Sequence, residues 1–187
     1  MTLYSAVLFV HVAAALGVFA ALCLEVVSLL HLRQATTASE ARLWLEFAPG
    51  LTAWTAASFL LLLLSGIFMT TQSSEWVLAW VRVALGALLL IGPLGAVTGR
   101  KMRAIRNACA SYTTNESDLV AKLRDPFLKF SVNIRVAVVL GIVLLMTAKP
   151  ELRQSLGIVV SAVFIGFVST VFWGRDTASP VARAESR

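Results

Sequence analysis

The chain has 187 residues, of which 58% are hydrophobic and 14% are charged, and its formal net charge at pH 7 is +6. So high a hydrophobic content is typical of a polytopic membrane protein. A nucleic-acid partner is excluded from the expected functions, because the basic residues flank apolar stretches and do not form one basic face.

Five apolar stretches follow one another along the chain. A bilayer core needs about 20 mostly apolar residues per helix, and five segments meet this requirement: residues 4–30, 47–71, 76–97, 127–148 and 156–173. The sequence therefore predicts an all-α bundle of five transmembrane helices, with one membrane domain over residues 1–174 and a short tail over 175–187. Residues 100–126 are predicted to form a polar loop containing two short amphipathic helices.

The Lys and Arg residues lie mostly on one side of the predicted membrane bundle. Counted over alternate connections, twelve Lys and Arg residues fall on one side of the predicted bundle and two on the other. Because cytoplasmic loops carry the excess of Lys and Arg, the N-terminus is predicted outside and the C-terminus in the cytoplasm. The expected location is a bacterial inner membrane, with the lipid bilayer as partner.

Four ionisable residues lie inside the spans and away from their ends, namely His11, Glu25, Arg82 and Arg135. Each is costly at membrane depth unless it finds a partner or water. Helix rise places Glu25 and Arg135 at a similar depth, about 12 to 14 Å from the predicted cytoplasmic ends of spans one and four. We therefore predict an ion pair between Glu25 and Arg135, which would make these two spans neighbours.

His11 and Glu25 are 14 residues apart, which is nearly four helical turns and brings them to one face of the first span. His11 has two readings. Its ring either hydrogen-bonds to a neighbouring helix or ligates a metal, as an axial haem ligand or a copper ligand. Met69 and Met146, near the ends of their spans, are candidate companions, since His and Met together suit Cu(I) or haem iron.

Arg82 lies at a depth similar to that of His11, about 9 to 12 Å from the predicted outer surface. With a haem present, its guanidinium would pair with a propionate, a role also open to Arg135. Without haem, Arg82 would extend to the membrane surface past Trp76 and Trp80.

Motifs of soluble enzymes are absent from the sequence: it contains no HExxH, GxSxG, P-loop or GxGxxG. Hydrolysis and nucleotide chemistry are therefore not expected. Redox chemistry stays open, since a bound cofactor would supply it with few protein groups. These motifs do not decide whether the protein is an enzyme.

Several short motifs resemble those of a broad superfamily of small bacterial membrane proteins: LFVHVAAALG at residues 8–17, WVR at 80–82, NIR at 133–135 and MTAKP at 146–150. That superfamily includes CopD-type copper-resistance proteins, HemJ-type protoporphyrinogen oxidases and uncharacterised predicted integral membrane proteins, the last being the most similar. The resemblance implies that His11 ligates haem b. Arg82 stands where the HemJ-type enzymes have a Lys.

Three functions follow as hypotheses. The first is a haem-binding redox protein that uses His11, with Arg82 or Arg135 for the propionates. The second is a small-solute or copper permease with Glu25 and Arg135 in the path. The third is an accessory subunit packed against a larger membrane complex or against a second copy of the chain.

Overall fold

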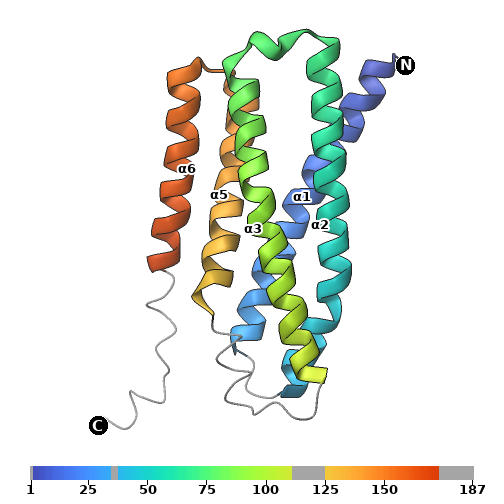
Figure 1. Ribbon diagram of the computed structural model, residues 1–187, viewed down its shortest axis with the longest axis vertical. Coiled ribbons are helices and arrows are strands. Elements are labelled where there is room, and N and C mark those ends of the chain that lie inside the picture. The colour runs from blue at the N-terminus through green and yellow to red at the C-terminus, as the bar shows by residue number, and fades with distance from the viewer. Residues whose placement is uncertain (1, 35–37, 111–124, 173–187) are drawn as a thin grey trace.

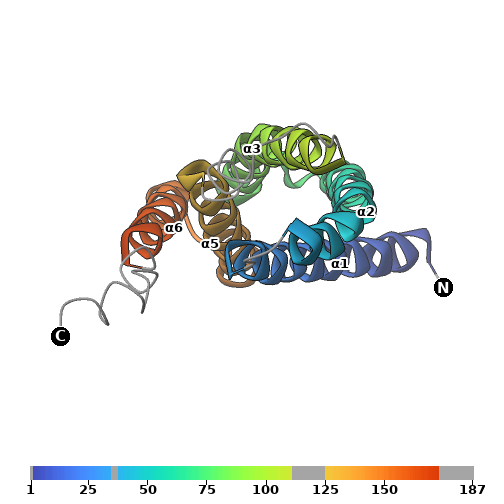
Figure 2. The same ribbon diagram turned by 90° about the horizontal axis from the view of Figure 1, so that it is seen from below.

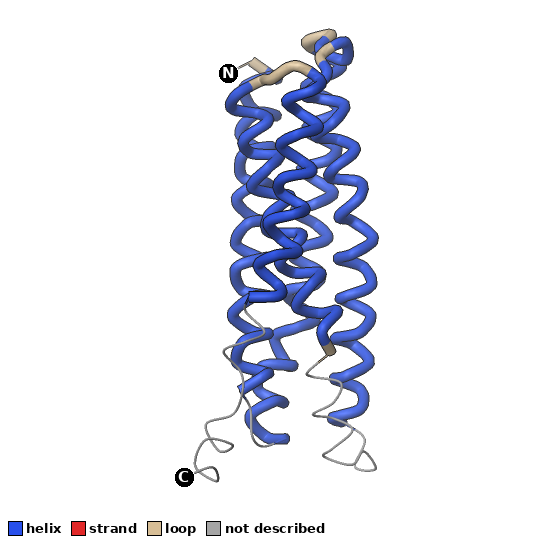
Figure 3. The backbone as a smooth tube through the Cα atoms, turned by 90° about the vertical axis from the view of Figure 1, so that its left-hand side faces the viewer, coloured by secondary structure: helices blue, strands red, loops and turns tan. Residues whose placement is uncertain are grey.

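The computed structural model describes residues 2–34, 38–110 and 125–172, and within them side chains over 2–32, 49–107 and 125–172. These residues form helices, without any strand (Figures 1 and 3). The helices are α1 (Leu3–Gln34), α2 (Ala38–Gln72), the short 3-10 helix η1 (Glu75–Val77), α3 (Ala79–Ala110), α5 (Pro126–Ala148) and α6 (Leu152–Phe172). Five of them are long and apolar enough to cross a membrane, which confirms the predicted five-span all-α fold.

Helix α3 differs most from its predicted span over residues 76–97. It begins later, at Ala79, because Glu75–Val77 form η1, and it continues to Ala110. Hydropathy ends a span where the side chains become too polar for lipid, but Lys, Arg and Ala remain good helix formers.

The prediction for the loop after this span changes accordingly. Residues 100–110 are the end of α3, so a loop beginning at residue 100 is wrong, and no separate short helix forms in that stretch. Residues 111–124, and with them the second predicted amphipathic helix, lie outside the described part of the chain, as does the tail over 175–187.

The ends of α5 follow from local sequence. Asp125 caps its N-terminus, accepting a hydrogen bond from the backbone N–H of Phe127 at 2.9 Å, and Pro126 occupies the first turn, where its missing N–H leaves no bond unmade. At the other end Lys149 adopts a left-handed conformation with φ 46°, and its N–H bonds to the carbonyl of Leu145 at 2.9 Å. Pro150 follows and prevents the helix from continuing.

Four helices surround a common interior. Seen along the bundle, α1, α2, α3 and α5 form a ring, while α6 lies outside it against α5 (Figure 2). Helix α1 crosses the bundle obliquely and packs mainly on α2, and α5 packs mainly on α6 and α3 (Figure 1). Half of the most apolar stretch of α5 is buried, against a third or less in the other spans, so α5 is the most deeply buried of the five helices.

The interior of the ring is a packed apolar core. Leu145 and Val138 of α5 are 0% and 1% exposed, and they join buried side chains from the other three helices of the ring. Large apolar residues such as Phe9, Leu16 and Phe164 remain exposed on the outer surface. Such a surface would aggregate in water but suits lipid, and together with the five spans it defines a multi-pass membrane protein.

Candidate functional site

A cavity of about 390 Å³ lies inside the ring, near the end where η1 connects α2 to α3. We call it the His11 cavity. It is formed by α1, α2, α3 and α5, and its polar or sulfur-bearing lining residues are Tyr4, His11, Met69, Thr70, Ser73, Glu75, Trp76, Trp80, Met146 and Lys149. The three side chains named from the sequence as candidate metal ligands, His11, Met69 and Met146, therefore share one cavity.

His11 is held by a hydrogen bond to α2. Its Nδ1 lies 2.9 Å from the hydroxyl oxygen of Ser65, and that hydroxyl lies 2.6 Å from the carbonyl of Leu61. A hydroxyl has one proton, and the carbonyl can only accept it, so Ser65 accepts from Nδ1–H of a neutral imidazole. The lone pair of such a ring is on Nε2, the arrangement by which protein side chains orient metal-binding histidines.

Gly66 provides the room for this ring. A Cβ atom at that position would lie 3.2 Å from Cε1 of His11, closer than most side chains tolerate. The Ser65-Gly66 pair on α2 thus both orients the imidazole and leaves space for it. This partner could not be chosen from the sequence, because Ser65 is one of several small residues in the second span.

Arg82 is not among the lining residues of the His11 cavity. Its side chain is exposed, and Nη2 donates to the carbonyl of Val77 at 3.3 Å, toward the nearer end of the bundle. This geometry matches the alternative in which Arg82 extends to the membrane surface.

Lys149 provides the cation that lines the cavity instead. Its ammonium lies 5.8 Å from the centroid of the Trp80 ring, within the range of a cation–π contact. In the sequence, Lys149 is one of the two basic residues assigned to connections on the predicted outer side. Its position directly before Pro150, at the end of a span, was the available signal.

A second cavity, of about 490 Å³, lies farther along the ring toward the ends of α1 and α3. We call it the ion-pair cavity, because Glu25 and Arg135 both line it. The predicted ion pair is present: Nη2 of Arg135 lies 2.5 Å from Oε1 of Glu25, with the side chains 5% and 15% exposed. Of the three residues proposed to hold haem, His11, Arg82 and Arg135, no two face the same cavity.

Packed side chains separate the two cavities. Leu62, Leu88 and Ile142 line the His11 cavity, whereas Val18, Ile91 and Val139 line the ion-pair cavity. All six belong to one cluster of buried residues. An apolar layer therefore divides the interior into two chambers.

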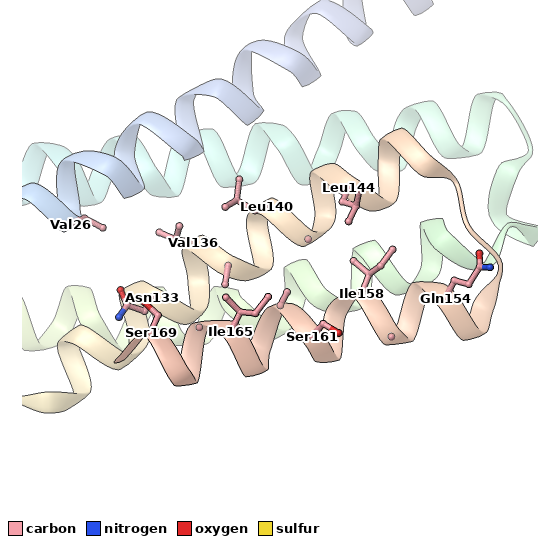
Figure 4. Close-up of a pocket in the computed structure, with 15 residues that line it drawn as sticks. Val26, Asn133, Val136, Leu140, Leu144, Gln154, Ile158, Ser161, Ile165 and Ser169 are labelled. Carbon is pink, nitrogen blue, oxygen red and sulfur yellow. The ribbon is translucent and has the colours of Figure 1, made fainter. Parts of the chain in front are cut away.

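A third hollow, of about 720 Å³, lies outside the ring in the groove between α5 and α6 (Figure 4). Asn133 on α5 and Ser161, Ser169 and Gln154 on α6 are its polar members. Asn133 donates to the hydroxyl of Thr170 at 3.2 Å and so links the two helices. The groove brings together none of the residues identified from the sequence as functional.

Comparison with protein-family models, with curated proteins and with solved structures gives no match. Within the described residues, no group of three or more His, Cys, Asp or Glu side chains is arranged to hold a metal ion. The fold and site define a multi-pass α-helical membrane protein with two interior chambers. Its relation to the CopD-type and HemJ-type proteins stays a prediction from short motifs.

Proposed function

We propose that the protein is a membrane haem protein in which His11 ligates the iron of haem b in the His11 cavity. The observation that carries the proposal is the hydrogen bond from His11 Nδ1 to Ser65, which leaves Nε2 as the ligating atom of a ring that lines a cavity.

The residues of the cavity fit such a group. Imidazole and thioether are the donor pair of many electron-transfer haems, and Met69 and Met146 line the same space as His11. The ammonium of Lys149 would pair with a propionate, the role expected from the sequence for Arg82 or Arg135. The volume of about 390 Å³ is at the low end of the usual range of cofactor and ligand pockets, roughly 300 to 1,000 Å³, so the cavity would enclose only part of a haem.

Each residue has a distinct part in this proposal. His11 holds the group, Ser65 fixes the orientation of the imidazole, and the apolar layer below the cavity excludes water from that side. A bound haem would supply one-electron chemistry, which the protein tunes through the axial ligands and the polarity around them.

The test is a reduced-minus-oxidised visible spectrum of the detergent-purified protein, with iron and copper quantified on the same sample. We expect a Soret band that is lost in His11→Ala and kept in His31→Ala. His31 is a matched control, because it lies on the same helix, is exposed and bonds through Nδ1 to the carbonyl of Val27 at 2.9 Å. An iron-free, colourless sample would overturn the haem proposal, and copper alone would reassign His11 to that metal.

A permease is the second candidate, favoured by the two chambers in series within one four-helix ring. Transporters bind their substrates near the middle of the membrane, and an apolar constriction, such as the layer between these two chambers, can close a pathway by excluding water. Uptake of copper or of small organic acids into proteoliposomes tests this function. No uptake of either, by protein whose ion pair is intact, would count against it.

For location we propose a bacterial inner membrane, with the N-terminus outside. The support is charge: Arg100, Lys101, Arg103 and Arg106 gather at the end of α3, opposite the end of the bundle where α1 begins (Figure 1). In a cysteine-free background, Thr2→Cys should react with a membrane-impermeant maleimide in intact cells and Arg103→Cys should not. The reverse pattern would invert the topology.

A further inference from the structure

Arg135 has hydrogen-bond donors for which the described residues provide no acceptor. Its Nη2 donates to Glu25, and Nε donates to the carbonyl of Ser131 at 3.4 Å. Among the described residues, no atom accepts a hydrogen bond from Nη1, although the side chain is only 5% exposed. Buried N–H groups without an acceptor are costly, so these two donors call for a partner that is not part of the described chain.

The space beside Nη1 is the ion-pair cavity. Arg135 lines it, and Gly95, which also lines it, lies so near that a Cβ atom there would be 3.4 Å from Nη1. The cavity is amphipathic. Its apolar body includes Leu22, Phe59, Leu60 and Met102, and its polar members are Glu25, Ser28, Thr52, Thr55 and Arg135.

The charges that line the ion-pair cavity favour a neutral ligand over a charged one. The Glu25–Arg135 pair is electrically neutral as a unit, so a charged ligand would bring an uncompensated charge into a low-dielectric interior. A neutral hydrogen-bond acceptor satisfies Nη1 without that penalty. A carbonyl oxygen attached to an apolar body meets both conditions.

We propose that the ion-pair cavity binds a neutral lipophilic carbonyl compound of the quinone class, whose carbonyl oxygen accepts from Nη1 of Arg135. The ring and tail of the ligand lie among the apolar side chains of α1, α2 and α3. The site is separate from the His11 cavity, and the proposal does not depend on haem.

The test uses Gly95→Ala, with Gly86→Ala as the control. The new methyl group of Gly95→Ala covers Nη1 at ordinary contact distance, whereas the methyl group of Gly86→Ala, on the same helix, meets no atom within 4 Å. Both changes remove a helix glycine, so their effects on helix propensity cancel in the comparison.

The probe is a benzoquinone carrying one isoprenyl unit, titrated into protein in lipid nanodiscs and followed by quenching of tryptophan fluorescence, with empty nanodiscs as the blank. We expect saturable binding with a dissociation constant raised at least tenfold by Gly95→Ala, since a hydrogen bond from a charged donor commonly accounts for that factor. Gly86→Ala and His11→Ala should leave the constant unchanged. An alkylbenzene of equal size, added as a competitor, should displace the quinone poorly and with no dependence on Gly95.

Three results would overturn the proposal. One is the absence of saturable quinone binding to the unmodified protein. Another is a quinone dissociation constant that Gly95→Ala leaves unchanged. The third is an alkylbenzene that binds as tightly as the quinone, because the cavity would then select for apolar surface alone. If Gly95→Ala lowers thermal stability, Ala56→Leu, which fills the cavity from α2, replaces it under the same criteria.

Discussion

Arg135 Nη2 and Glu25 Oε1 lie 2.5 Å apart, although 110 residues separate the two positions in the chain. The contact ties α1 to α5, its second neighbour in the ring, while α1 makes most of its packing contacts with α2. Arg135 is buried and Glu25 is partly buried, so each charge depends largely on the other for compensation. The pair therefore serves as an orienting link between the two halves of the bundle as well as a wall of the ion-pair cavity.

Removing one partner of this pair should be strongly destabilising. We expect Glu25→Ala to lower the free energy of unfolding by about 3 to 5 kcal/mol, because Arg135 is left as an unpaired buried charge. Glu25→Met combined with Arg135→Met should recover most of the loss, since two apolar residues leave no charge uncompensated. Thermal unfolding in detergent measures both, and a double variant no more stable than Glu25→Ala would contradict this account.

Gly166 sets the approach of α6 to α5. A Cβ atom there would lie 2.9 Å from Cα of Ile134 and 3.1 Å from the carbonyl oxygen of Asn133, and backbone atoms cannot move aside cheaply. We expect Gly166→Ala to cost about 1 to 3 kcal/mol through overpacking. Gly157→Ala on the same helix meets no atom within 4 Å and should be neutral or slightly stabilising. Equal thermal stabilities for the two variants would show that α6 can shift freely on α5.

Ser65 should matter to haem binding through the orientation of His11. We expect Ser65→Ala to weaken haem affinity by about 10- to 100-fold, the usual effect of losing the partner of a ligating imidazole. Ser58→Ala is the control, because Ser58 is also a buried serine of α2 but lies against Gly17 instead of His11. Haem titration of the two apoproteins compares them, and an equal loss in both would mean a general packing effect.

Asp125 has two roles that substitution can separate. It caps α5 and forms a 2.5 Å salt bridge with Lys101, in which the side chains are 40% and 29% exposed for Lys101 and Asp125. Asp125→Ala should cost about 0.5 to 2 kcal/mol by loss of the cap. Asp125→Asn should cost about 1 kcal/mol or less, because it retains a capping oxygen and loses only a partly exposed ion pair. If thermal melts show Asn to be as damaging as Ala, the salt bridge contributes more than the cap.

The five spans and the Glu25–Arg135 pair could be predicted from the sequence alone. Hydropathy alone located the five spans, and helix rise placed Glu25 and Arg135 at one depth, where the cost of two buried charges required them to meet. The same periodicity put His11 and Glu25 on the inward face of the first helix, and Ala14, Val18 and Leu22 along that face are buried. These inferences succeed because membrane depth and helical face depend only on position along one helix.

The rest was decided by tertiary packing. Arg82 and His11 share a depth, yet Arg82 turns away from the cavity, and Lys149 enters from a helix end that hydropathy assigned to a loop. The choice of Ser65 as partner to His11, and the apolar layer that divides the interior, also needed the three-dimensional arrangement. The sequence by itself determined how many helices cross the membrane and which charges must be paired. Only the packing of those helices determined which side chains of neighbouring helices face one another, because this depends on the fit between neighbouring surfaces.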